Sequence, residues 1–373
     1  MRFKLFLGIV LVMLLVLFAP RGMVSAQDGD NLCPQLIEDV ISELGTNCAN
    51  LLSGQVCYGY EIVEAMPIPG VTIPDGAFDA PGERLPVTDV ARIDTSPLDL
   101  EADPPTWGFA IVKTDAFIGM NEETGEPETA ELVFIVPGGV ELEAVNAPEY
   151  DEDGNLLIGE VDGQIYLGPM QEIFVRNLFE DPVCDGSIPP FLFVQSETNE
   201  EIDLIVNGTT IRLEGTIVIE VLTDGVADRD GEVDGVLLGD TLRVTTLFGL
   251  ATLNPDTANE IILPPGYFSE ICLDDPQDVG LDQQENDQPV GALCTWSDPA
   301  PLSQIDLDRL EALELLPNNL IDPVDVPVRV VPSGIGAPPF QFVFTNPAAL
   351  ALAQEACTAT PPLLPLAICS TLF

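Results

Sequence analysis

The central part of the chain alternates apolar and polar residues, which is the pattern of half-buried β-strands. Residues 202–206 and 209–213 are two such runs, and Asn207-Gly208 joins them. Both central residues of a type I′ turn need positive φ, so Asn-Gly between alternating runs predicts a β-hairpin. Further strands are predicted at 216–222, 236–238, 241–247, 250–253 and 260–263. The stretch therefore predicts an antiparallel meander.

A second group of predicted strands lies upstream, separated by glycine and proline. These strands are residues 107–112, 131–136, 140–145, 164–167 and 172–175. The second and third are expected to form a hairpin around Pro137-Gly138-Gly139. Short strands with such turns favour a sandwich or jelly-roll-like arrangement of antiparallel sheets.

Helical spacing of apolar residues is confined to the two ends of the chain. Residues 34–44 predict a helix with Pro34 at its first position and Gly45 as its stop. A short second helix is expected at 48–52, and residues 66–80 form a linker or long excursion. Near the C-terminus Ser303 and Asp306 resemble a capping box before a leucine-rich face that ends at Pro317.

The remaining C-terminal residues predict strands at 326–331 and 340–344 and a last helix at 348–357, capped by Asn346. The expected fold class is therefore mainly β: antiparallel sheets with a short N-terminal helical segment and a few C-terminal helices.

The first 26 residues predict a secretory signal peptide. A basic start precedes an almost wholly apolar run over residues 5–18, and Val24-Ser25-Ala26 offers a small-residue cleavage site. The run is short for a transmembrane anchor, which is the alternative. We expect a secreted or cell-surface protein with no membrane span after cleavage.

Charge and composition narrow the choice of partner. The chain has 12 basic and 62 acidic residues, and cleavage would leave nine basic ones. Such a negative charge disfavours binding to nucleic acid and to anionic membranes. Because 46% of the chain is hydrophobic, it does not have the composition of a disordered acidic tail.

Eight cysteines follow the leader, and their even number in an exported chain predicts disulfides. They are Cys33, Cys48, Cys57, Cys184, Cys272, Cys294, Cys357 and Cys369. Three precede residue 60, so full pairing requires at least one bridge from the N-terminal segment to a distant part of the chain. Cys357 with Cys369 is the simplest local pair, and Cys184 with Cys272 would bracket the meander. Free buried thiols are the alternative.

Candidate chemistry is sparse. The chain has no histidine, which excludes His-dependent triads and most catalytic zinc sites, and no phosphate-binding loop or nucleophile-elbow motif occurs. Asp228, Asp230 and Asp234 have the spacing of a calcium loop, with an ion-free acidic turn as the alternative. Residues 151–155 are a weaker version of the same pattern.

Other residues admit functional and structural interpretations. Paired carboxylates could act in a glycoside hydrolase, but spacing selects no pair among so many acids. Trp107 and Trp296 could stack on sugars, although a tryptophan in a Trp-Gly strand is more often a core residue. Asn207-Gly208-Thr209 is also a glycosylation sequon, which the Asn-Gly turn explains without a glycan.

The second β unit resembles the FecR-type β domain of exported bacterial proteins. The resemblance rests on residues 207–213, 215–222 and 239–253 and on the turn Pro264-Pro265-Gly266. More loosely, Cys57-Tyr58-Gly59 and Trp107-Gly108 are similar to features of large exported bacterial proteins. Signalling members of the FecR family span the inner membrane, an architecture that this chain lacks.

We therefore expect a signal peptide (1–26), a Cys-containing helical segment and linker (27–81), a first β domain (82–183), a FecR-like β domain (184–275) and a mixed C-terminal region (276–373). The predicted function is a non-catalytic binding or structural module at or outside the cell surface, whose partner is a surface polymer or protein. The alternatives are a calcium-stabilised carbohydrate-binding or adhesive protein and a carboxylate-based glycoside hydrolase. No cofactor is predicted apart from calcium in the first alternative.

Overall fold

The structure is a computed structural model. It describes residues 29–177, 184, 187–196, 200–222, 241–273, 295–323, 326–330 and 341–344, and within the last segment 350, 351, 354, 357, 358 and 366–369. Several predictions lie outside the described residues: the signal peptide, the strand at 236–238, the candidate calcium ligands Asp228, Asp230 and Asp234, Cys294, and the cap Asn346.

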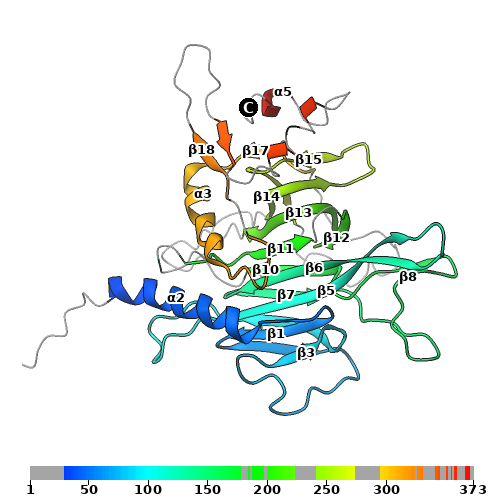
Figure 1. The fold of residues 1–373 in the computed structure, drawn as a ribbon, viewed down its shortest axis with the longest axis horizontal. Helices are drawn as coiled ribbons and strands as arrows, with labels where there is room; N and C mark the ends of the chain where they lie inside the picture. The colour runs from blue at the N-terminus through cyan, green and yellow to red at the C-terminus, as the bar shows by residue number, and fades with distance from the viewer. Residues whose placement is uncertain are drawn as a thin grey trace, which may run out of the picture.

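The prediction of a mainly β fold is confirmed. Eleven strands of the described residues follow one another across a large curled sheet, in the order β2-β4-β7-β10-β12-β13-β11-β6-β5-β1-β3. From β13 the sheet continues through β14 to β15, β16 and β17. Strands β10 and β12 are parallel, so the sheet is mixed. It curls into a half-barrel (Figure 1). The sequence had instead predicted antiparallel sheets in a sandwich or jelly-roll-like arrangement.

The strands of this sheet are β1 (Gln55–Tyr60), β2 (Val63–Pro67), β3 (Arg84–Pro86), β4 (Val90–Thr95), β5 (Phe109–Met120), β6 (Pro127–Pro137), β7 (Val140–Ala144), β10 (Glu172–Asn177), β11 (Leu192–Ser196), β12 (Ile202–Val206), β13 (Thr209–Leu222), β14 (Thr241–Leu253), β15 (Ile261–Leu263), β16 (Tyr267–Cys272) and β17 (Ala300–Pro301). Two separate pairs are β8 (Gly159–Val161) with β9 (Gln164–Tyr166), and β18 (Val328–Val330) with β19 (Gln341–Val343). A 3₁₀ turn, η1 (Val87–Asp89), precedes β4.

The predicted Asn-Gly hairpin is confirmed and joins β12 to β13. Asn207 and Gly208 have φ of 48° and 76°, as a type I′ turn requires. The Asn207 side chain also holds the turn against β10: Oδ1 accepts from the Val175 N–H at 2.9 Å, and Nδ2 donates to the Val175 carbonyl at 3.1 Å. The amide of the sequon is therefore engaged inside the sheet.

The meander has fewer and longer strands than predicted. β13 continues through Gly215, and β14 continues through Gly249, where the sequence predicted breaks. These two glycines face each other, and an added Cβ at Gly249 would lie 1.7 Å from the Glu214 carbonyl oxygen. Glycine here allows close backbone contact between paired strands and does not end them.

The hairpin predicted around Pro137-Gly138-Gly139 is wrong. β6 pairs with β5 and β11, whereas β7 pairs with β4 and β10. The chain instead turns a corner at which the Thr95 hydroxyl donates to the Pro137 and Val140 carbonyls, at 2.7 and 3.0 Å. A Cβ on Gly138 would meet the Ser96 oxygen and the Trp107 ring, each at 2.4 Å. Tertiary packing around this glycine directs the two strands apart.

Two hydrophobic cores lie on opposite faces of the sheet. Strand residues such as Val112, Leu142 and Leu204 fill the inner core, where β5 contacts both β4 and β12 across the curl. The outer core lies between the other face and the helices α2 (Gly29–Asn47), α3 (Gln304–Leu310) and η2 (Glu311–Leu315). Trp107 is 1% exposed and belongs to this outer core, in agreement with the structural interpretation of the Trp-Gly strand.

The N-terminal helix differs from its predicted bounds. α2 begins before Pro34, which lies inside it, and continues past Gly45 to Asn47. A Cβ on Gly45 would lie 3.0 Å from Pro317, so this glycine allows close packing and does not stop the helix. The second helix predicted at 48–52 is absent from the described residues, which form turns there, with Asn50 at positive φ.

The C-terminal predictions agree more closely with the structure. The Ser303–Asp306 capping box starts α3, and β18 and β19 form the two predicted strands. Leu350, Ala351, Gln354 and Cys357 are helical, and a short helix α5 (Leu366–Cys369) follows. No helix in the described part of the chain is long and apolar enough to cross a membrane.

Three disulfides connect the described residues: Cys33–Cys184, Cys48–Cys57 and Cys357–Cys369. The long-range bridge from the N-terminal segment and the local pair near the C-terminus are confirmed. The Cys184–Cys272 pairing is wrong, because Cys184 is bonded to Cys33, 151 residues away in sequence. Disulfides persist in oxidising compartments, so these bridges indicate an extracytoplasmic location.

Candidate functional site

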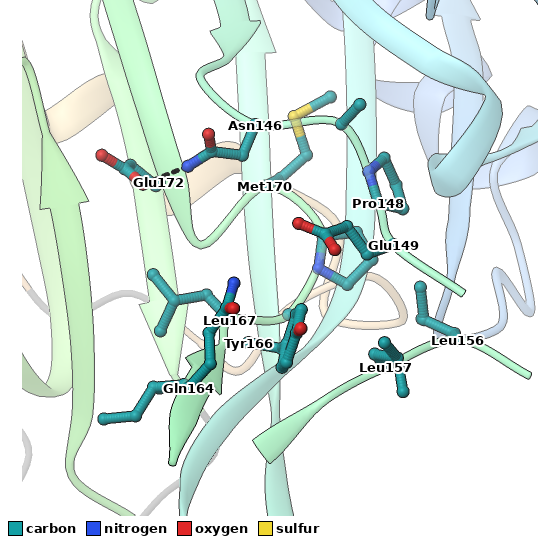
Figure 2. Close-up of a pocket in the computed structure, with 14 residues that line it drawn as sticks. Asn146, Pro148, Glu149, Leu156, Leu157, Gln164, Tyr166, Leu167, Met170 and Glu172 are labelled. Carbon is teal, nitrogen blue, oxygen red and sulfur yellow. Dashed lines mark hydrogen bonds between the residues drawn. The ribbon is translucent and has the colours of Figure 1, made fainter. Parts of the chain in front are cut away.

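A pocket of about 220 Å³ lies beside the β8–β9 hairpin, and we call it the hairpin pocket (Figure 2). Three separate segments and the start of β10 form it. Its lining residues are Asn146, Ala147, Pro148, Glu149, Leu156, Leu157, Gln164, Ile165, Tyr166, Leu167, Gly168, Pro169, Met170 and Glu172.

The floor of the hairpin pocket is attached firmly to the sheet through Gln171. This side chain is fully buried. Its Oε1 accepts from the N–H groups of Phe117 and Gly168, at 2.8 and 2.9 Å, and its Nε2 donates to the carbonyls of Phe117 and Asp203, both at 2.8 Å. The amide thereby uses both donors and both acceptor positions. It connects β5 to β12 across the curl and fixes the loop that precedes β10.

The same loop contacts β5 at two further points. The Thr114 hydroxyl donates to the Pro169 carbonyl at 2.8 Å. An added Cβ at Gly168 would lie 2.0 Å from the Asp115 carbonyl oxygen, so only glycine permits this approach. The floor is therefore preformed.

Two tight turns lie next to the lining segments in the sequence. Asp162 and Gly163 connect β8 to β9, just before the lining residue Gln164, with φ of 53° and 81°. Before Leu156, the Asp151 carboxylate accepts from the N–H groups of Asp153 and Asn155 and from the Asn155 side chain. These hydrogen bonds lower the pKa of Asp151 below its ordinary value, the Asn155 side-chain bond contributing most. This acidic segment is thus a turn closed by its own carboxylate.

Negative charge and apolar surface meet in the hairpin pocket. Glu149, Glu172 and Tyr166 all line it, and the Asn146 side chain donates to the Glu172 carboxylate, which lies apart from Tyr166 (Figure 2). No lysine or arginine lines it. Beside it on the hairpin, Ile165 is 63% exposed. The arrangement can accept hydrogen bonds from a cation and can cover an aliphatic or aromatic group.

The basic side chains of the described residues do not neutralise this pocket, because all are engaged elsewhere. Six form ion pairs with carboxylates and two donate to backbone carbonyls. The ion-paired residues are Arg92, Lys113, Arg176, Arg212, Arg243 and Arg309, and the other two are Arg84 and Arg329. In the described part of the chain, acidic side chains therefore greatly outnumber the basic ones.

Two facing carboxylates occur on the outer surface of the sheet, where Asp94 of β4 lies opposite Glu141 of β7. Burial raises the pKa of Asp94, and the Arg92 charge opposes this shift. Arg92 pairs with both carboxylates, and Arg176 also bonds Glu141. Neither carboxylate lines the hairpin pocket. The pair is a charge cluster stabilised by arginines.

Other candidates from the sequence are distributed as follows. Within the described ranges, no group of three or more acidic, cysteine or histidine side chains could hold a metal ion. Asp228, Asp230 and Asp234 lie outside those ranges, so calcium binding there stays a prediction. Tyr166 and Glu172 lie in strands predicted from the sequence without an assigned function, and no sequence signal singles out Glu149. The turn Asp162-Gly163 was the available signal for a hairpin there.

The fold and the pocket define a mainly β, disulfide-linked half-barrel with a small acidic pocket at its surface. No protein-family model matches the chain, no curated protein matches its sequence, and no solved structure matches its fold. The function is therefore argued from the geometry and charge of the site.

Proposed function

We propose that the protein is an exported, non-catalytic binding module that acts at or outside the cell surface, and that the hairpin pocket receives a lysine or arginine side chain of a partner protein. The observation that carries this proposal is the combination of Glu149, Glu172 and Tyr166 around a preformed floor, with no basic residue in the lining. The resemblance to FecR-type β domains and the three disulfides support an exported role.

The size of the pocket favours a side chain over a whole small molecule. Sites for drug-sized ligands enclose about 300–1,000 Å³, and the hairpin pocket encloses about 220 Å³. A partly exposed ion pair contributes up to ~1 kcal/mol, and a cation over a tyrosine ring contributes ~0.5–2 kcal/mol. These terms alone give weak binding, so the partner must also cover the exposed apolar residues Val161 and Ile165.

The proposal can be tested by calorimetry with two blocked pentapeptides that differ in one charge, Ala-Leu-Lys-Leu-Ala and its norleucine analogue. We expect the lysine peptide to bind more tightly, and the double variant Glu149→Gln, Glu172→Gln to weaken its binding at least tenfold. The matched control is Glu38→Gln, Glu311→Gln, which removes the same charge from exposed positions in α2 and η2.

Retention of lysine-peptide affinity by the control supports a local site. Equal losses in both double variants would show that the overall charge attracts the peptide and would overturn the pocket assignment. Equal affinity for both peptides would also overturn it.

A further inference from the structure

A second cavity, of about 610 Å³, opens near the β12–β13 turn, and we call it the Trp296 pocket. It lies at one margin of the inner core, to which Ile271 and Trp296 belong. Its volume falls in the usual range for sites that enclose a small molecule. The lining residues are Gly208, Thr209, Thr210, Asn254, Asn259, Glu260, Ile261, Ile271, Thr295 and Trp296.

Two polar side chains in this lining are buried without a hydrogen-bond partner. The Trp296 indole Nε1 and the Thr209 hydroxyl have none, although the residues are only 6% and 7% exposed. A buried, unpaired polar group costs ~1–3 kcal/mol, and the large majority of such groups in proteins are paired. Two of them in one cavity point to a ligand that supplies the missing bonds.

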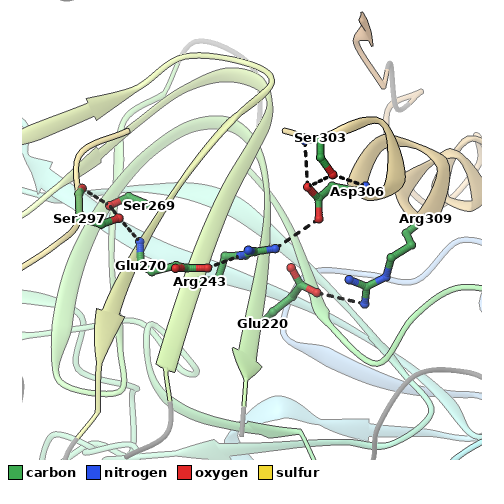
Figure 3. A network of polar contacts seen from close by, with 8 residues as sticks. All are labelled: Glu220, Arg243, Ser269, Glu270, Ser297, Ser303, Asp306 and Arg309. Carbon is green, nitrogen blue, oxygen red and sulfur yellow. Dashed lines mark hydrogen bonds and ion pairs between the residues drawn. The ribbon is translucent and has the colours of Figure 1, made fainter. Parts of the chain in front are cut away.

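The backbone around both residues is held independently of any ligand. Thr209 pairs with Val206 in the hairpin ladder. The residue after Trp296 is attached to β16: the Ser297 N–H donates to the Glu270 carbonyl at 2.8 Å, and the Ser269 hydroxyl donates to the Ser297 carbonyl at 2.7 Å (Figure 3). The two unpaired groups therefore belong to a preformed wall.

The lining segment from Asn254 to Glu260 is held in place by hydrogen bonds. The Asn254 N–H donates to the Thr210 carbonyl at 3.0 Å, and the Thr257 hydroxyl donates to the Asn254 carbonyl at 2.8 Å. The Glu260 carboxylate accepts from the Asp256 N–H at 2.9 Å. Asn254, Asn259 and Glu260 of this segment belong to the lining.

We infer that the Trp296 pocket binds a neutral saccharide. The indole N–H only donates, while threonine and asparagine side chains both donate and accept. A sugar ring offers both kinds of partner through its hydroxyls and has apolar C–H surface to cover the partly exposed Ile261. The single charged residue of the lining is Glu260, so anionic ligands are disfavoured. Because the tryptophan ring is buried, it contributes its N–H and not a stacking face.

This inference is independent of the proposed function, because the two pockets share no lining residue. The test uses the full chain in two arms: calorimetry with free cellobiose, maltose, lactose, mannobiose and diacetylchitobiose, and an array of immobilised oligosaccharides with neutral termini. The variants are Trp296→Phe, which keeps an aromatic ring but removes the five-membered ring with its N–H, and Thr209→Val, which replaces the hydroxyl by a methyl group. Thr129→Val, at an exposed position of β6, is the matched control.

We expect at least one saccharide to bind, and each pocket variant to weaken that binding at least tenfold while the control leaves it unchanged. Because Thr209→Val removes an unpaired hydroxyl at nearly constant volume, its thermal stability should equal or exceed that of the wild type. Trp296→Phe also leaves a cavity in the inner core, so Thr209→Val is the variant that separates lost binding from lost stability. Binding only on the array would identify a polymer as the source of the sugar and would still support the site. Absence of binding in both arms, or unchanged affinity in the pocket variants, would overturn the inference.

Discussion

Replacing Gln171 by methionine tests the idea that one buried amide holds the curl of the sheet. Methionine has a similar length and removes all four hydrogen bonds of the side chain. Two backbone N–H groups, of Phe117 and Gly168, then lose their acceptor, and the carbonyls of Phe117 and Asp203 lose a donor. The side chain is fully buried, so water does not replace these partners without local opening.

The expected loss follows from the unpaired donors. Each buried N–H left without an acceptor costs ~1–3 kcal/mol, and the carbonyls retain a second lone pair, so the free energy of unfolding should fall by about 4 kcal/mol. With a urea dependence of about 3 kcal/mol per molar, the unfolding midpoint should move by about 1.3 M. Urea titration followed by circular dichroism measures this shift.

The control is Gln164→Met on β9, where the glutamine is exposed and the midpoint should move by less than ~0.2 M. A similarly small shift for Gln171→Met would refute the reasoning. Gln171→Glu adds a pH test: burial raises the pKa of the new carboxyl, so the folded state holds its proton to higher pH. The stability of this variant should therefore fall as pH rises through that pKa.

Four further predictions follow from charge, disulfides and the acidic loop. Burial raises the pKa of Asp94 in the folded state above its unfolded value, so the free energy of unfolding should fall as pH rises between the two pKa values. Asp94→Asn should abolish this part of the pH dependence. An unchanged pH profile in the variant would contradict the raised pKa of Asp94. Sodium chloride should raise the melting temperature measured by calorimetry, since it screens repulsion in a chain with a formal charge of −50. A lower melting temperature in salt would show that attraction within ion pairs outweighs this repulsion. The Ser297 N–H donates to the carbonyl of Glu270, two residues before Cys272, so the chain returns beside β16. We therefore expect non-reducing peptide mapping to find Cys272 linked to Cys294. A peptide that links either cysteine to another residue would exclude this bridge. If the acidic loop binds calcium, EDTA should lower the melting temperature of the wild type but not of the Asp228→Asn, Asp230→Asn variant; equal responses would locate any calcium effect outside this loop.

Local signals predicted individual elements well. The Asn207-Gly208 hairpin and the Ser303–Asp306 capping box were predicted from neighbouring residues, because a turn needing positive φ and a helix start are determined within a few residues. The pairing of Cys357 with Cys369 likewise follows from short separation. Predicted breaks at Gly215 and Gly249 were wrong because glycine in a strand also marks close backbone contact.

The candidate sites were much less accessible to sequence reasoning. Glu149, Tyr166 and Glu172 line one pocket from separate positions in the sequence, and Gln171 bonds the loop before β10 to β5 and β12. Likewise, nothing in the sequence around Thr209 and Trp296 indicates that both line one cavity. Such proximity depends on strand order and curl, which arise from contacts distant in sequence.

The sequence by itself determined the mainly β character, the acidic charge, the Asn207-Gly208 hairpin turn and the use of cysteines in bridges, because composition and local backbone preference carry that information. Only the tertiary structure decided that the strands join in one curled mixed sheet, that Cys33 bonds Cys184, and that β6 and β7 diverge at Gly138. The physical reason is that strand partners are selected by burial of side chains on both faces of the sheet, and this burial exists only once distant segments have come together.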